Sequence, residues 1–437
     1  MLRSFRLSNH RSFHGEQELL LRPAYDRARA VVPVAAVYGA NASGKSNLIG
    51  GLRFMAHLVR TSPLSEPGTG IPRQPFRSDG EGEGEPSLFV VEIVAGDVRY
   101  TYGFSVDDER VLAEWLYGYP YGKKRLLFER DSDRISFGSS VQHRRDAELM
   151  ERAVRQESLF LGVAARLGLT DVQDAYRWIQ RSLRFPRFNS YLAESRVTRF
   201  IERSKRSHEL LLGLLRSADL GIVDVWLARP STDEALFAAD AEEAWSDAAP
   251  GGTDELNDQA ELEFDRRLVR FDKRRLALTH GSGEKFLLRD ESAGTRSWLS
   301  LLPDLIDCLD SGSVLVVDEI DTSLHPLLVR KLIEIFRSRQ CNPNGGQLVF
   351  TTHDAYLLAP VGGEAALERD QVWFVEKAVD GSSRLYPLSD FQPRNEHNLA
   401  RRYLGGAYGA VPFLDEMDEI GARVSGTESD GVDATRE

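Results

Sequence analysis

The sequence predicts an α/β fold with a mixed sheet, an antiparallel lobe and an inserted α-helical subdomain. Residues 31–37 form an apolar run of strand length that ends at a glycine-rich loop, and a helical pattern follows this loop. Residues 87–137 alternate apolar and polar side chains in the manner of antiparallel strands and hairpins. From residue 276 the chain returns to alternating strand and helix patterns, which are typical of α/β proteins.

The chain has 437 residues, of which 42% are apolar, so it can bury the cores of two or three compact units. In order, we expect an N-terminal lobe with the glycine-rich loop and the antiparallel strands (1–140), an inserted helical subdomain with an acidic loop (141–275), a C-terminal lobe (276–414) and a disordered acidic tail (415–437). The acidic loop, residues 233–263, contains no Lys or Arg, which favours a loose conformation.

The composition excludes several classes of protein. The formal net charge of −12 argues against a surface that binds nucleic acid everywhere. No apolar run approaches the roughly eighteen residues that span a bilayer, and the first residues lack the apolar stretch of a signal peptide. We therefore expect a cytoplasmic protein with no membrane contact. The two cysteines, Cys308 and Cys341, have no metal-binding or disulfide spacing.

Residues 39–46 read Gly-Ala-Asn-Ala-Ser-Gly-Lys-Ser, which matches a Walker A phosphate loop between a strand and a helix. The glycines let backbone N–H groups turn toward the β-phosphate, Lys45 supplies a positive charge to the β and γ oxygens, and the Ser46 hydroxyl reaches Mg²⁺. A glycine-rich turn without a ligand is the alternative. The expected contacts to ATP in and after the loop are Asn41, Ala42, Ser43, Gly44, Lys45, Ser46 and Asn47.

Two adjacent acids follow the apolar strand at residues 314–317, where a parallel sheet presents ligand-binding groups. This pattern is typical of Walker B. Asp318 is the candidate ligand of Mg²⁺, and Glu319 is the candidate general base that polarises the attacking water. Taken alone, the pair is also compatible with a solvated turn.

Three further segments resemble motifs of ABC and SMC-like ATPases. Residues 320–326 match the D-loop, and residues 351–354 match the segment with the switch histidine, which makes His353 a candidate γ-phosphate sensor and third catalytic residue beside Lys45 and Glu319. Residues 290–295 resemble a diverged signature loop. There, Ser292 and Gly294 at a helix N-terminus suit the γ-phosphate bound to an opposite subunit, and an ordinary N-capping turn is the alternative.

The order of these motifs, preceded by Asn-His-Arg-Ser-Phe at residues 9–13, is similar to that of OLD-like and RloA-like ATPases of prokaryotic abortive-infection systems. Residues 402–412 also resemble the end of that branch. The resemblance implies an ABC/SMC-type P-loop ATPase head that dimerises on ATP, with Arg11 near the nucleotide and Asp321 facing across the dimer. His10 stands where that family usually has an aromatic residue. A glutamine lid is also expected, and Gln74 is the candidate.

The OLD nucleases append a metal-dependent TOPRIM domain, and we expect this chain to lack one and to have no nuclease activity of its own. The leading hypothesis is therefore a Mg²⁺-dependent ATPase that senses phage infection as a homodimer or larger homo-oligomer and controls a separate effector, a nuclease or toxin. One alternative is a DNA-binding repair or segregation ATPase that contacts phosphates through the basic residues between Arg177 and Arg206, which a salt-bridged helical face also explains. Another is a small-molecule P-loop kinase.

Overall fold

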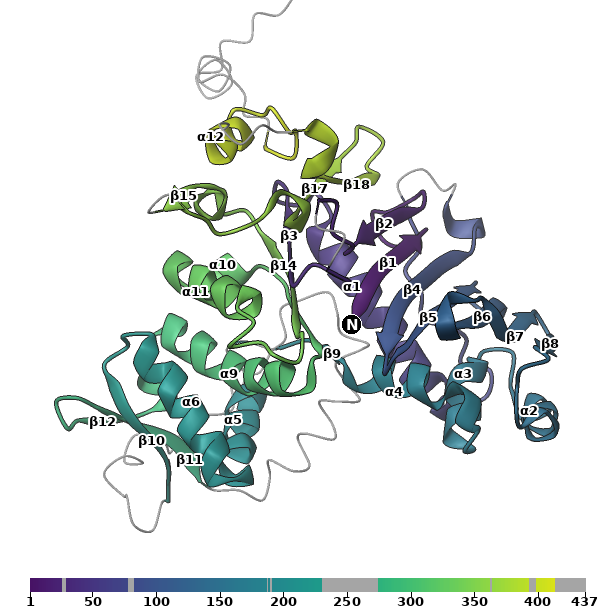
Figure 1. Cartoon of the computed structure of the whole chain (residues 1–437), viewed down its shortest axis with the longest axis horizontal. Coiled ribbons are helices and arrows are strands. Elements are labelled where there is room, and N and C mark those ends of the chain that lie inside the picture. Colours follow the sequence, from purple (N-terminus) through teal and green to yellow (C-terminus); the bar gives the residue numbers. More distant parts are fainter. Residues whose placement is uncertain are drawn as a thin grey trace, which may run out of the picture.

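The computed structural model describes residues 1–25, 29–77, 82–186, 188, 191–229, 274–361, 364–392 and 398–412. The predicted acidic loop at residues 233–263 and the predicted tail at residues 415–437 lie outside this part of the chain. Two lobes lie side by side in Figure 1, with α1 (Lys45–Thr61) and β3 (Val34–Tyr38) between them. The predicted antiparallel lobe and the α/β core are both present.

A seven-stranded antiparallel sheet forms the lobe on the right of Figure 1, in the order β2-β1-β4-β5-β6-β7-β8. Its strands are β1 (Leu2–Ser8), β2 (Gln17–Leu20), β4 (Ser87–Ala95), β5 (Val98–Val106), β6 (Val111–Tyr119), β7 (Arg125–Asp131) and β8 (Arg134–Phe137). Along β4, β5 and β6, buried side chains tend to alternate with partly exposed ones, because one face packs on helices and the opposite face meets solvent.

The second large sheet has six strands in the order β18-β17-β3-β14-β13-β9. Besides β3, its strands are β9 (Leu183–Arg184), β13 (Val314–Val317), β14 (Gln347–Thr352), β17 (Val372–Lys377) and β18 (Ser383–Pro387). All neighbours are parallel except β17 and β18. Every residue of the central strands β3, β13 and β14 is buried, as expected for parallel strands covered on both faces.

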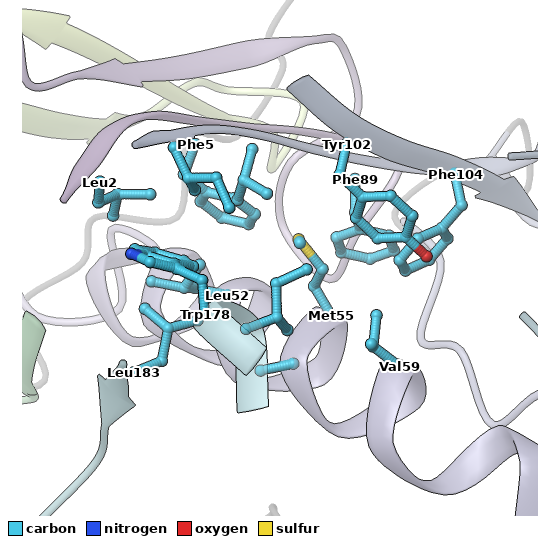
Figure 2. Close-up of a cluster of buried hydrophobic side chains, with 14 of the residues drawn as sticks. Leu2, Phe5, Leu52, Met55, Val59, Phe89, Tyr102, Phe104, Trp178 and Leu183 are labelled. Carbon is cyan, nitrogen blue, oxygen red and sulfur yellow. The ribbon is translucent and has the colours of Figure 1, made fainter. Parts of the chain in front are cut away.

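The helix α1 joins the two sheets through its apolar stripe. Leu48, Leu52, Met55 and Val59 recur every three or four residues, lie on one side of the helix and are buried. Figure 2 shows this stripe facing side chains of the antiparallel sheet, among them Phe5, Phe89, Tyr102 and Phe104. The sequence pattern after residue 45 therefore correctly predicted both the helix and its buried face.

The helices of the predicted insertion at residues 141–275 divide between two hydrophobic cores. The elements α2 (Arg144–Glu151), α3 (Phe160–Arg166) and α4 (Gln173–Arg181) contribute buried residues to the core around α1. By contrast, α5 (Tyr191–Arg203) and α6 (Lys205–Ser217) pack on α9 (Ala293–Ser311) in the second core. The periodicity predicted helices correctly, but they do not form a single subdomain, and β9 between them extends the main sheet.

Three arginines of the basic run form ion pairs with α9. Arg196 Nη2 lies 2.6 Å from Asp304 Oδ1, and Arg203 Nη1 lies 2.7 Å from Asp307 Oδ1. Arg184 reaches the same aspartates. Burial raises the pKa of the Asp304 carboxyl, and the neighbouring arginines oppose that shift. These arginines therefore bind α5 and β9 to α9, which leaves them less available for phosphates.

A three-stranded antiparallel sheet precedes α9, and shorter elements complete the C-terminal half. The sheet has the order β10-β11-β12. The bounds are β10 (Ile222–Ala228), β11 (Arg275–His280), β12 (Lys285–Leu287), α10 (Ile320–Ser323), α11 (Pro326–Arg337), β15 (Pro360–Val361), β16 (Glu364–Ala365) and α12 (Leu399–Leu404). None of the helices in the described ranges combines the length and the apolar character needed to cross a bilayer.

A buried carboxylate fixes the start of α3 beneath the antiparallel sheet. Glu114 on β6 is fully buried and accepts hydrogen bonds from the backbone N–H groups of Phe160 (2.6 Å) and Leu161 (2.9 Å) and from the hydroxyl of Tyr102 (2.9 Å). Burial raises the pKa of Glu114, whereas the positive charge of buried Arg130 lowers it. The Glu114 cluster thus supplies the first N–H groups of α3 with acceptors that the helix itself cannot provide.

Candidate functional site

The predicted motifs meet at one edge of the six-stranded sheet. β3, β14 and β13 are adjacent parallel strands, so their C-terminal ends lie at the same edge. β3 ends immediately before Gly39, β14 immediately before His353 and β13 immediately before Asp318. The strand that carries the switch histidine lies between the other two.

The glycine-rich loop between β3 and α1 needs residues without bulky side chains. Gly44 has φ 111° and Ala42 has φ 60°, both in the left-handed region. A Cβ at Gly44 would collide with the hydroxyl groups of Ser383 and Ser12, so only glycine fits there. The loop therefore approaches its neighbours through backbone atoms, which is what a cradle for phosphate oxygens requires.

Lys45, the first residue of α1, points back into the loop. Its Nζ donates hydrogen bonds to the carbonyl oxygens of Gly39 (2.8 Å) and Ala40 (2.9 Å), and only 5% of the residue is exposed. Burial lowers the pKa of the Lys45 ammonium. The negative charges of three nearby carboxylates act in the opposite direction, those of Glu319, Asp318 and Asp321. The structure thus brings the predicted Walker A cation and the predicted Walker B acids together.

Thr351 at the end of β14 connects the two acids that follow β13. Its hydroxyl donates to Asp318 Oδ1 at 2.5 Å and accepts from the backbone N–H of Glu319 at 2.7 Å. Glu319 is exposed and has φ 46° and ψ 55°, a left-handed conformation that is uncommon outside glycine. The strained turn separates the two carboxylates, so Asp318 stays tied to the sheet while Glu319 faces solvent.

Asp321 holds His353 within the same chain. The Asp321 Oδ2 atom lies 2.8 Å from His353 Nδ1 and accepts from the His353 backbone N–H at 3.0 Å. The Asp321 side chain is only 6% exposed, whereas His353 is 58% exposed. Within its own chain, the Asp321 carboxylate thus positions the switch histidine. That Asp321 also faces across a dimer, as the resemblance implies, stays a prediction.

Arg11 and Gln74 lie together beside the start of α1. Arg11 donates from Nε to Gln74 Oε1 at 2.6 Å, and its backbone N–H donates to the Gln74 carbonyl at 2.7 Å. An open pocket of about 430 Å³ adjoins them and is lined by Arg11, Ser12, Asn47, Gln74, Phe76, Arg77, Lys377 and Gly381. Three cations in this lining suit an anionic ligand. The candidate residues Arg11, Asn47 and Gln74 therefore share one pocket next to the phosphate loop.

Serine hydroxyl groups that the sequence did not predict link this pocket to the phosphate loop by hydrogen bonds. Ser383 on β18 donates from Oγ to the Ser43 carbonyl at 2.6 Å and is hydrogen-bonded to Ser12 Oγ at 2.7 Å. Asn47 donates to the same Ser12 hydroxyl at 2.7 Å. Single serines carry no motif, so no sequence signal pointed to Ser383. Thr351 belongs to the switch segment at residues 351–354, but nothing in the sequence indicated a role for its hydroxyl.

The predicted signature residues lie at the N-terminus of α9. Ser292 is the N-cap, and its Oγ accepts from the Thr295 backbone N–H at 3.1 Å. Ser292 and Gly294 are both exposed. Within the described ranges, no hydrogen bond or ion pair joins either residue to the phosphate loop. They are therefore not assembled with Lys45 in a single chain.

The residues present fit a hydrated magnesium ion better than a metal held by protein alone. No cluster of three or more His, Cys, Asp or Glu side chains in the described part of the chain is arranged to bind a metal ion. Mg²⁺ at a nucleotide site takes one or two protein oxygens and completes its octahedron with water and phosphate oxygens. The exposed Ser46 hydroxyl and the half-buried Asp318 carboxylate provide such oxygens.

A protein-family model described as "AAA domain, putative AbiEii toxin, Type IV TA system" matches residues 34–359. The match runs from the start of β3 to the segment after His353, and so contains the three strands β3, β13 and β14 that carry the predicted motifs. The chain belongs to this AAA domain family. As an AAA domain protein, the chain has an ATPase-type nucleotide-binding fold. The OLD-like and RloA-like branch within such ATPases stays a prediction.

The AAA domain chain is also similar to solved structures of SMC head domains. The head domain from Thermotoga maritima is 12% identical, with coverage of 88% of this chain and 98% of that chain and a TM-score of 0.39. A head domain with an extended coiled coil, bound to the C-terminal domain of ScpA and derived from Pyrococcus furiosus, is 10% identical, with coverages of 90% and 97% and a TM-score of 0.40. No curated protein matches the sequence.

Proposed function

We propose that this AAA domain protein binds ATP with Mg²⁺ and hydrolyses it at sites shared between two copies of the chain. The observation that supports this most is the meeting of Lys45, Asp318, Glu319 and His353 at the ends of three adjacent parallel strands. A cation, a metal-binding acid, a solvent-facing acid and a histidine are the groups that phosphoryl transfer to water needs.

Each residue has a distinct role in this proposal. Lys45 exchanges its hydrogen bonds to the loop carbonyls for bonds to the β and γ phosphate oxygens. Ser46 and Asp318 would hold Mg²⁺, which would supply positive charge to the phosphoryl group. Glu319, exposed beside Asp318, takes the proton of the attacking water. His353, fixed through Asp321, contacts the γ-phosphate.

The exposed signature residues support a shared site. Ser292 and Gly294 sit at the N-terminus of a long helix, where backbone N–H groups and the helix dipole favour an anion. Since they do not reach the loop of their own chain, a second copy supplies them. Light scattering of the Glu319→Gln variant is expected to show a dimer with ATP and a monomer without it. Identical masses in both conditions would contradict the shared site.

Within this proposal, the ATPase acts as the sensor and regulatory subunit of an anti-phage system and controls a separate effector. The family description, which refers to a toxin of a type IV toxin–antitoxin system, supports the defence setting. The test is to purify Glu319→Gln with ATP from the native host and to identify the proteins that accompany it, with Lys45→Ala as the control that cannot form the ATP state. Growth arrest or nuclease activity from this chain alone would overturn the effector model.

Replacing Lys45 by Ala is expected to weaken ATP binding by about ten- to a hundredfold, because a hydrogen bond to a charged group contributes roughly 1.5–3 kcal/mol. Isothermal titration with ATP and Mg²⁺ measures the change. Lys331→Ala on α11 removes an equally charged but exposed side chain and serves as the matched control. Equal affinities of the Lys45→Ala and Lys331→Ala variants would show that the loop does not bind the phosphates.

Asp321 and His353 are expected to act as one unit in recognising the γ-phosphate. Asp321→Ala should reduce the preference for ATP over ADP about tenfold, since it releases the charge-assisted contact that holds the imidazole. His353→Ala should have the same effect, and the double variant should be no worse than either single one. Competition binding of ATP and ADP provides the comparison. Additive losses would mean that Asp321 acts elsewhere, for example across a dimer.

A further inference from the structure

The antiparallel sheet packs one face on the core around α1. The composition of its opposite face, called the outer face here, is not explained by this packing. Figure 2 shows Tyr102 and Phe104 of β5 pointing to the core above α1. Side chains alternate along a strand, so Arg99, Thr101 and Gly103 of the same strand lie on the opposite face. All but Gly103 are partly exposed.

This outer face carries a row of aromatic side chains on β6. Directly opposite the outer residues of β5, the pairs are Gly103 with Trp115, Thr101 with Tyr117 and Arg99 with Tyr119. The three aromatic residues are spaced two apart, which places them about 7 Å from one another along the strand. All three are partly exposed. We refer to Trp115, Tyr117 and Tyr119 as the aromatic row.

The indole of Trp115 lies across the backbone of Gly103. A Cβ at Gly103 would lie 2.5 Å from Trp115 Cζ2 and 2.8 Å from Cε2, so a side chain there would push the ring away. Glycine inside a strand weakens it and marks a close approach. The absent side chain thus allows the ring to lie on the sheet and to turn its other face outward.

Cations flank the aromatic row on both strands and on the following turn. Arg99 Cζ lies 3.9 Å from the ring centre of Tyr119, and Lys124 Nζ lies 3.7 Å from that of Tyr117. Lys123 and Arg125 are exposed beside them, and neither forms an ion pair with another described residue. Tyr121 at the tip of the turn is 99% exposed. The whole chain has a net charge of −12, so this cluster of positive charge is a local feature that contrasts with the overall negative charge.

The acids near the aromatic row leave its positive charge in excess. Glu129 on β7 pairs with Trp115. Burial raises the pKa of the Tyr117 hydroxyl, and the negative charge of Glu129 adds to this shift. Glu92 on β4 is already bound by Arg3 at 2.5 Å, with Arg99 at 3.6 Å. The end of the row near Tyr119 and the turn after it therefore face solvent with a net positive charge.

We propose that this face binds single-stranded nucleic acid, with bases stacked on the aromatic row and phosphates held by the flanking cations. Unpaired bases stack on aromatic rings on a sheet surface, and two or three rings in a row engage two or three nucleotides. A duplex hides its base faces and offers no equivalent contact. The site lies on the opposite face of the sheet from the α1 core and goes beyond the proposed ATPase function, on which it does not depend.

Fluorescence anisotropy with labelled fifteen-nucleotide oligomers of dT and of U, compared with a DNA duplex of equal length, tests the proposal at low salt without ATP. At least one single strand is expected to bind, more tightly than the duplex, and the stronger of the two distinguishes DNA from RNA. Failure of both single strands to bind, or binding of the duplex with equal affinity, would overturn the proposal.

Variants of the rings separate stacking from a structural effect. Tyr117→Ala and Tyr119→Ala are each expected to weaken binding about fivefold or more, since stacking on one aromatic ring contributes that much per base. Tyr117→Phe and Tyr119→Phe keep the ring and should retain the affinity. Circular dichroism confirms that the variants are folded. Equal affinity of the Ala and Phe variants would show that the rings take no part.

Variants of the cations locate the phosphate contacts. The double variant Lys123→Glu/Arg125→Glu should lower the slope of log affinity against log salt by about 1.4, the value for two phosphate contacts of a single strand. Lys331→Glu/Arg339→Glu makes the same charge change on exposed positions in and after α11 and should leave the slope unchanged. An equal effect of both double variants would mean that net charge, and not this face, drives binding.

Discussion

Replacing Glu319 by Gln is expected to reduce the ATP turnover of the chain by about 10²–10⁴-fold, the range that general-base catalysis contributes. The amide keeps the size of the side chain but cannot take a proton from water. Glu319 is exposed next to Asp318, and the Thr351 hydroxyl fixes its backbone N–H, so the substitution leaves the turn in place. Affinity for ATP should therefore change little, and steady-state phosphate release with titration of ATP measures both quantities.

The matched control for this substitution is Glu334→Gln on α11. Glu334 is half-exposed and pairs with lysine and arginine side chains of its own helix, and its loss should leave turnover unchanged. Hydrolysis by Glu319→Gln at the wild-type rate would refute the assignment of the general base. Hydrolysis by both variants at an equally reduced rate would point to a loss of folded protein instead.

Replacing Glu114 by Ala is expected to lower the free energy of unfolding by about 3–5 kcal/mol, because it leaves several buried donors without an acceptor, each at a cost of roughly 1–3 kcal/mol. The substitution leaves the N–H groups of Phe160 and Leu161 without their acceptor and removes the negative charge beside buried Arg130. Urea denaturation followed by circular dichroism gives the difference from the shift of the midpoint at constant slope.

Two further variants serve as references for the effect of Glu114→Ala. Glu114→Gln keeps an acceptor oxygen and the shape of the side chain, so it should destabilise the protein less than Glu114→Ala. Glu109→Ala removes an exposed carboxylate from the turn between β5 and β6 and should change stability by less than about 0.5 kcal/mol. If Glu114→Ala unfolds at the same urea concentration as Glu109→Ala, the Glu114 cluster has no stabilising role.

The sequence alone was sufficient for the parts of the site that depend on short segments. A buried run followed by a glycine-rich loop predicted the strand, the turn and α1, because the strand length, the need for positive φ and the helical stripe are all local properties. The same reasoning placed Asp318 and His353 at the ends of strands. That these strands are neighbours could be expected from the motif order, but not the place of β14 between β3 and β13.

Contacts between distant segments could not be predicted. Ser383 lies 340 residues from the Ser43 carbonyl that it binds, and an isolated serine gives no pattern to recognise. The helical periodicity of residues 144–217 showed that these helices bury one face, but a periodic pattern does not say which core covers it. The basic run had the same limitation, since Arg196 and Arg203 pair with Asp304 and Asp307 about a hundred residues later.

The strand β3 takes part in both hydrophobic cores of the molecule. Val34, Ala36 and Tyr38 pack in the core with α9, whereas Ala35 and Val37 pack in the core with α1. Five residues therefore form a partition wall that the two halves of the protein share. A rearrangement of either half is expected to move β3, and the phosphate loop begins where β3 ends. Each half of the protein therefore packs directly on the strand that ends at the phosphate loop, without an intervening linker.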